Sequence, residues 1–95
     1  MKFTYKTIDI KSSVKWRHFY PPEHQVRLDK SIVGYIDDVY PHRITLITRG
    51  ENNKSKNFTL SRKNETLDDA KLWLNCVYDY IIENFNLYII DRKIT

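Results

Sequence analysis

The chain has 95 residues, of which 41% are apolar, and a formal net charge of +4 at pH 7. Its length predicts one domain with a modest hydrophobic core, and its two glycines and three prolines argue against long disordered tracts. Its single cysteine, Cys76, excludes an internal disulfide bond and is typical of a reducing compartment.

The first residues lack the apolar run of a signal peptide, and no stretch approaches the roughly 20 apolar residues of a membrane span. We therefore expect a cytoplasmic protein in which residues 1–95 form a single domain without contact to a membrane. The charge is unevenly distributed, with a net charge of +7 over residues 1–63 and −3 over residues 64–95. The first two thirds of the chain thus favour an anionic partner more than the last third does.

Two strands are predicted near the N-terminus. Residues 2–10 are rich in Thr, Tyr, Phe and Ile, although the alternation of their side chains slips by one position. Residues 13–20 alternate cleanly between two faces. Pro21-Pro22 ends this strand because proline lacks a backbone donor, so we expect residues 21–30 to form an irregular connection.

The middle of the chain carries the strongest strand signals. Residues 31–40 and 43–49 are apolar and rich in β-branched side chains, and Pro41-His42 between them offers a turn. Residues 50–54 have the composition of a loop. A further short strand is predicted at residues 56–61.

The hydrophobic period then changes from two residues to between three and four. From Leu67 to Phe85, apolar residues recur at helical spacing, and Thr66 offers a capping hydroxyl at the start. We predict one helix at about residues 66–84, followed by an apolar segment at 87–90 that could return to the sheet. The order of elements predicts an α+β fold, with a mostly antiparallel sheet of four or five strands packed against one main α-helix.

Catalytic and metal-binding patterns are weak in this sequence. The three histidines, His18, His24 and His42, lack the spacing of metal ligands, and we interpret them as surface or strand-edge residues. As neighbours in a strand, Asp37 and Asp38 would point to opposite faces and could not share a proton, and a turn or bulge with solvated carboxylates explains them better. No base is near Cys76 in the sequence. We therefore expect no enzyme activity, no metal and no cofactor.

A basic stretch from Arg49 to Lys63 is the first candidate for a binding surface. It holds five cations and one acid, Glu51, together with several asparagines. These residues could form a positive lobe, although solvated charge that serves solubility explains the same pattern.

The second candidate is the aromatic and basic stretch of residues 14–27. By strand parity, Trp16 belongs to the core face, whereas Lys15 and Arg17 point outward. The residues after this strand would form a stiff projection with aromatic and arginine side chains, which are the usual anchors of protein interfaces. The candidate partner-binding residues are Lys15, Arg17, Phe19, Tyr20, Arg27, Arg49, Lys54, Lys56, Arg62 and Lys63.

Residues 31–80 resemble small phage-encoded proteins of strand–strand–strand–helix type, a class that includes anti-CRISPR and other anti-defence inhibitors. The resemblance lies in Gly34-Tyr35, in Phe58-Thr59-Leu60 and in the phrase T-L-D-D-A-K-x-W that begins at Thr66. The chain departs from this pattern by the insertion of Ser61–Glu65 before the helix. No site residues are carried over from it.

The resemblance implies a small non-catalytic inhibitor, monomeric or homodimeric, that binds and blocks a larger host protein or a CRISPR-Cas-like nucleoprotein complex in the host cytoplasm. The alternative hypothesis is a small basic module that contacts nucleic acid directly. It depends on the charge of residues 1–63 and predicts binding that weakens steeply with salt.

Overall fold

The computed structural model describes residues 2–8 and 22–89 of the chain. Its regular elements, in chain order, are β1 (Thr4–Ile8), β2 (Glu23–Leu28), β3 (Ser31–Ile36), β4 (Ile44–Arg49), a short 3₁₀ turn (Glu51–Asn53), β5 (Ser55–Thr59), α1 (Leu67–Cys76) and α2 (Tyr78–Asn84). The strand predicted at residues 13–20, with Trp16 in it, lies outside the described residues.

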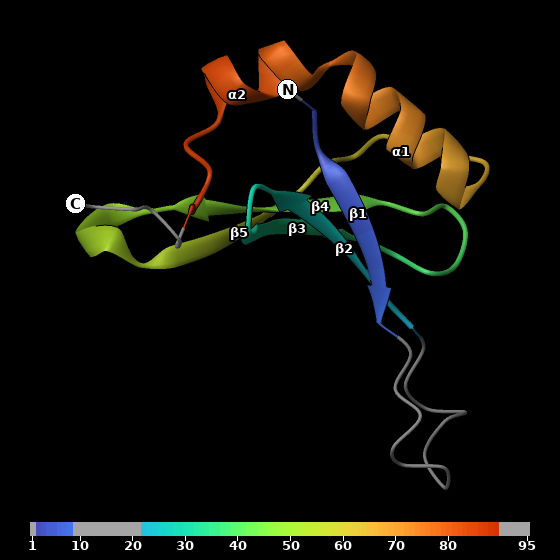
Figure 1. Cartoon of the computed structure of the whole chain (residues 1–95), viewed down its shortest axis with the longest axis horizontal. Coiled ribbons are helices and arrows are strands. Elements are labelled where there is room, and N and C mark those ends of the chain that lie inside the picture. The colour runs from blue at the N-terminus through green and yellow to red at the C-terminus, as the bar shows by residue number, and fades with distance from the viewer. Residues whose placement is uncertain (1, 9–21, 90–95) are drawn as a thin grey trace, which may run out of the picture.

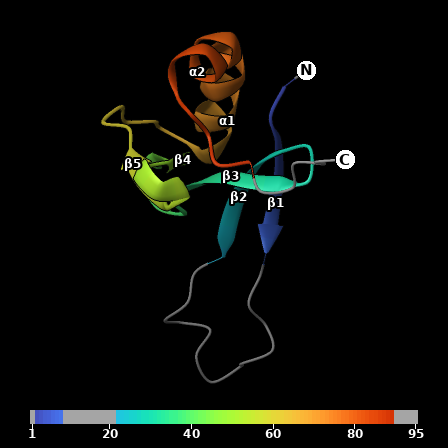
Figure 2. The same cartoon turned by 90° about the vertical axis from the view of Figure 1, so that its left-hand side faces the viewer.

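The five strands form one antiparallel sheet in the order β1-β2-β3-β4-β5, so each strand pairs with its neighbours in the sequence. Figure 1 shows α1 and α2 together on one face of this sheet, and Figure 2 shows the same two layers from the side. This arrangement confirms the predicted α+β class and the antiparallel sheet.

The irregular connection predicted at residues 21–30 is wrong, because most of this segment forms β2. Its side chains alternate, and those of Val26 and Leu28 reach the core. Asp29 has a positive φ of 57° in the tight connection that leads into β3. Since β2 pairs with a strand on each side, hydrogen bonds to both neighbours satisfy its polar backbone.

The pairing of β4 with β3 covers only the first half of β4, where Ile44 lies opposite Ile36. Along the second half, a bridge joins Thr48 to Leu87, with hydrogen bonds of 2.7 Å from Arg49 N to Asn86 O and 2.9 Å from Tyr88 N to Ile47 O. The predicted return of residues 87–90 to the sheet therefore takes the form of a single bridge within the described residues.

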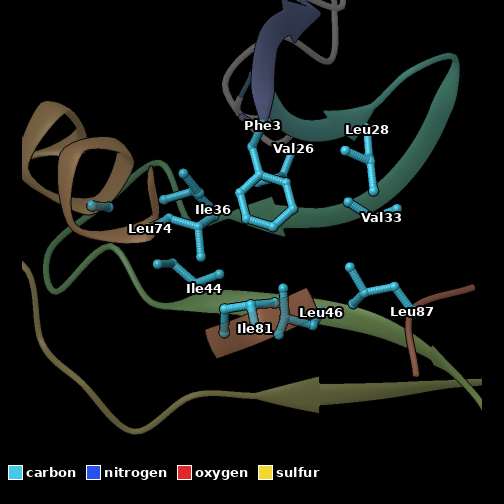
Figure 3. Close-up of a cluster of buried hydrophobic side chains, with 11 residues drawn as sticks. Phe3, Val26, Leu28, Val33, Ile36, Ile44, Leu46, Leu74, Ile81 and Leu87 are labelled. Carbon is cyan, nitrogen blue, oxygen red and sulfur yellow. The ribbon is translucent and has the colours of Figure 1, made fainter. Parts of the chain in front are cut away.

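The core lies between the sheet and the two helices, and Figure 3 shows its side chains converging from every layer. Val26 and Leu46 from the sheet and Leu74 from α1 are 0% exposed. The buried apolar residues are Phe3, Val26, Leu28, Val33, Ile36, Ile44, Leu46, Ala70, Leu74, Ile81 and Leu87.

The predicted helix begins where expected, since the hydroxyl of Thr66 accepts a hydrogen bond of 3.0 Å from Asp69 N. It is not continuous, because Val77, with φ −103° and ψ 19°, separates α1 from α2. Leu74 and Ile81 lie on opposite sides of this break and are both buried. The apolar period thus continues through the break. For this reason the sequence pattern alone predicted a single helix.

Candidate functional site

The face of the sheet that points away from the helices carries a row of five side chains, one from each strand. The strand register places Lys6 opposite Gln25, Gln25 opposite Tyr35, Tyr35 opposite Thr45, and Thr45 opposite Thr59. Side chains alternate along a strand, and the core residues Val26, Ile36 and Leu46 are sequence neighbours of Gln25, Tyr35 and Thr45, so the row lies on the side away from the core. Within the row, Gln25 is only 8% exposed. We call this side of the sheet the open face.

Cations outnumber acids on the open face. Arg27 lies two residues beyond Gln25 on β2, and the guanidinium of Arg49 lies 4.3 Å from the centre of the Tyr88 ring. Arg49 also donates hydrogen bonds of 3.4 Å to Asn53 Oδ1 and to Ile89 O, and these contacts hold its planar group in place.

Tyr35 stands at the middle of the row and is half-buried. Burial and the negative charge of Glu23 raise the pKa of its phenol, so the hydroxyl keeps its proton at neutral pH. Glu23 itself accepts a hydrogen bond of 2.6 Å from Gln25 Nε2. The centre of the open face is therefore an uncharged aromatic ring that feels the Glu23 carboxylate, while Lys6, Arg27 and Arg49 lie elsewhere on the same face.

A second feature lies on the helix side, where an open hollow of about 320 Å³ adjoins α1. Within it, the guanidinium of Arg62 lies 4.9 Å from the centre of the Trp73 ring. The residues that line the hollow are Arg62, Lys63, Asn64, Glu65, Asp69, Leu72, Trp73 and Cys76.

Asn64, which is only 2% exposed, joins this hollow to the loop between β3 and β4. Its Nδ2 donates a hydrogen bond of 2.9 Å to His42 O, and its backbone N donates one of 2.8 Å to Pro41 O. Its Oδ1 accepts one of 3.0 Å from Arg62 Nε. The two loops are therefore held together at this end of the molecule (Figure 1).

Three large apolar side chains are exposed around the same end. Val39 and Tyr40 in the loop between β3 and β4 are 65% and 59% exposed, and Leu72 on α1 is 66% exposed. Together with Arg62 and Trp73, they form what we call the α1-end surface.

The candidate residues predicted from the sequence fall into separate places. Arg27 and Arg49 lie on the open face, and the structure thus removes Arg27 from the stiff projection predicted after Pro22. Lys54 and Lys56 are exposed at the connection between β4 and β5 and at the start of β5.

Arg62 and Lys63 line the hollow on the helix side. The basic stretch from Arg49 to Lys63 is consequently divided among three places and does not form a single lobe. Lys15, Arg17, Phe19 and Tyr20 lie outside the described residues.

Sequence reasoning missed Lys6, Tyr35 and Tyr88 on the open face. The parity of β3 contained the signal for Tyr35, because it alternates with the core residue Ile36. The α1-end surface had no comparable signal, because the hydrogen bonds of Asn64 bring together loops that are about twenty residues apart.

The interpretation of the histidines as surface or strand-edge residues is wrong for His24, which is buried on β2. Its Nε2 lies 2.6 Å from Asp38 Oδ1, and its Nδ1 lies 3.0 Å from Thr7 Oγ1. The ring therefore links β1 and β2 to the loop after β3. Within residues 2–8 and 22–89, no group of three or more His, Cys, Asp or Glu residues has the arrangement of a metal site.

Comparison of the chain with protein-family models, with curated proteins and with solved structures gave no match. Neither helix of the described part has the length and apolar character needed to cross a membrane.

Proposed function

We propose that this chain is a small non-catalytic binding protein of the phage-inhibitor type, which covers a surface of a larger host defence complex through protein contacts. The observation that carries the proposal is the α1-end surface. It combines exposed apolar side chains with an arginine and a tryptophan beside a hollow.

These residue types suit a protein interface. Tyr, Trp and Arg supply most of the binding energy in protein complexes, especially where they surround or fill a pocket. On the α1-end surface, Tyr40 projects into solvent, while Trp73 and Arg62 stack beside the hollow. A partner side chain that enters this hollow would cover apolar surface that now meets water.

The surface is also rigid enough to bind without a large ordering cost. Asn64 holds the loop before α1 against the loop after β3, and Arg62 is held by both Asn64 and Trp73. Groups that are already in place lose less conformational entropy on binding than mobile groups do. This favours an inhibitor that acts by occupying a surface. In the proposal it does so in the cytoplasm of the host, as a monomer or a homodimer.

The test is co-purification of the tagged chain with purified candidate defence complexes, together with plaque counts on a host that expresses or lacks the chain. We expect a bound complex and more plaques when the chain is present. Tyr40→Ala should abolish both effects, because it removes an exposed anchor of the α1-end surface.

Tyr80→Ala is the matched control, since Tyr80 on α2 is 62% exposed and lies outside the α1-end surface. Equal effects of the two substitutions, or normal function of Tyr40→Ala, would count against the α1-end surface as the contact. The absence of both a bound complex and a change in plaques would count against the inhibitor itself.

A further inference from the structure

We infer that the open face is a second binding site, which takes single-stranded nucleic acid. This site is independent of the α1-end surface, because the open face lies on the side of the sheet opposite the helices (Figure 1). Of the described elements, none covers it.

The charge of the open face selects an anionic occupant. Lys6, Arg27 and Arg49 come from three different strands and meet one acid, Glu23, whose carboxylate already accepts a hydrogen bond from Gln25. A phosphate backbone that crosses the strands would meet each of these cations in turn.

The aromatic groups of the open face suit unpaired bases. Single-stranded nucleic acids bind sheets by stacking bases on aromatic rings and on arginine planes, beside cations that meet the phosphates. Tyr35 offers a ring at the centre of the face. Arg49 offers a guanidinium group, which lies 4.3 Å from the centre of the Tyr88 ring.

The sheet geometry places these two platforms close together. Tyr88 donates its backbone N–H to Ile47, and Ile47 lies two residues along β4 from Thr45, the partner of Tyr35. Two residues of a strand span about 7 Å, so neighbouring bases of one extended strand can reach both platforms. A duplex hides its base faces within the stack and would meet only the cations.

The hydrogen-bonding groups of the row complete the site. Thr45 and Thr59 have hydroxyl groups that lie 2.9 Å apart. Hydroxyl groups both donate and accept, so they bond equally well to the edges of several bases. Gln25, between Lys6 and Tyr35, is only 8% exposed and donates to Glu23, so we assign it no contact with the bases. We therefore expect tolerance of sequence and a preference for single strands.

The experiment measures fluorescence anisotropy of the full chain with labelled single-stranded DNA and RNA of about twelve nucleotides, and with a duplex of the same length. The single strands should bind at low salt and the duplex more weakly. From the three cations, we expect the logarithm of affinity to fall with the logarithm of salt with a slope of about −2 or steeper. Whichever of single-stranded DNA and single-stranded RNA binds with the higher affinity is identified as the natural ligand.

Substitutions at Tyr35 separate stacking from charge. Tyr35→Leu should weaken single-strand binding about tenfold, whereas Tyr35→Phe, which keeps the ring, should retain the affinity.

Arg27→Ala should reduce the magnitude of the salt slope by about 0.7. Lys63→Ala removes one cation on the helix side and should leave the slope unchanged.

Three results would overturn the inference. The first is no binding of either single strand at low salt. The second is duplex binding as tight as single-strand binding. The third is a dimer in sedimentation that Arg27→Ala dissociates, because a second copy would then occupy the open face. Thermal melting confirms that each variant is folded, and if Tyr35→Leu is not, the salt slope of Arg27→Ala decides alone.

Discussion

Gly34 on β3 and Thr45 on β4 approach so closely that a Cβ on Gly34 would lie 2.5 Å from the carbonyl oxygen of Thr45. Because backbone atoms of a central strand cannot move aside, only glycine fits at this position. This contact also sets the spacing of the open face, since Thr45 lies next to Tyr35 in the row.

Gly34→Ala should therefore destabilise the protein by about 2 kcal/mol or more, because the added methyl group pushes β3 away from β4. Chemical denaturation measures the free energy of unfolding. Gly50→Ala is the control, because its Cβ would lie 3.3 Å from the nearest backbone atom, and we expect a change of less than about 1 kcal/mol. Equal losses in the two variants would contradict the close approach at Gly34.

Tyr5 makes the stability sensitive to alkaline pH. Its hydroxyl donates a hydrogen bond of 3.1 Å to Lys71 O on α1, and burial raises the pKa of the phenol from 10.0 to about 12. The folded state thus holds this proton more tightly than the unfolded state does. The stabilisation is complete below pH 10 and is lost as the pH rises towards 12.

Tyr5→Phe removes both the hydrogen bond and the titrating group. At neutral pH, the variant should be less stable by about 1 kcal/mol. The difference in free energy of unfolding between the two proteins should shrink as the pH rises above 10, because the phenol of Tyr5 is the one titrating group that Tyr5→Phe removes. Denaturation curves across this range measure the difference, and parallel curves would rule out the proposed role of the phenol.

Asn64 is the contact that builds the α1-end surface. Asn64→Ala leaves the carbonyl of His42 without its donor and frees Arg62, so we expect a loss of about 1–3 kcal/mol in stability. Asn57→Ala, on the exposed edge strand β5, should change stability by less than about 0.5 kcal/mol. Thermal melting compares the two variants, and a neutral Asn64→Ala would show that the loops meet without its side chain.

Thr66 caps the start of α1. Thr66→Ala removes the acceptor for Asp69 N and should lower the free energy of unfolding by about 1 kcal/mol. Thr66→Ser keeps the hydroxyl and should restore most of this stability. Urea denaturation of the three proteins measures both effects, and a failure of serine to rescue would place the loss elsewhere than in the cap.

Much of the fold follows from local pattern. The apolar and β-branched composition of residues 31–40 and 43–49 predicted β3 and β4, although β3 ends earlier, at Ile36, and Thr66 marked the start of the helix. β2 was missed because Pro21-Pro22 and several charged residues resemble a connection, although Glu23–Leu28 alternates like a strand. Of the candidate site, Arg27 and Arg49 were found by composition, but their common face required the register of β2 and β4.

By itself, the sequence determined the class of fold, the capped start of the helix and the existence of β3 and β4, because each depends on side chains a few residues apart. Only the tertiary structure decided that Lys6, Tyr35 and Arg49 share one face, and that Asn64 joins the loop before α1 to His42. These relationships depend on hydrogen bonds between distant segments. The register of these distant segments is set by the packing of the whole core, so no local sequence pattern specifies it.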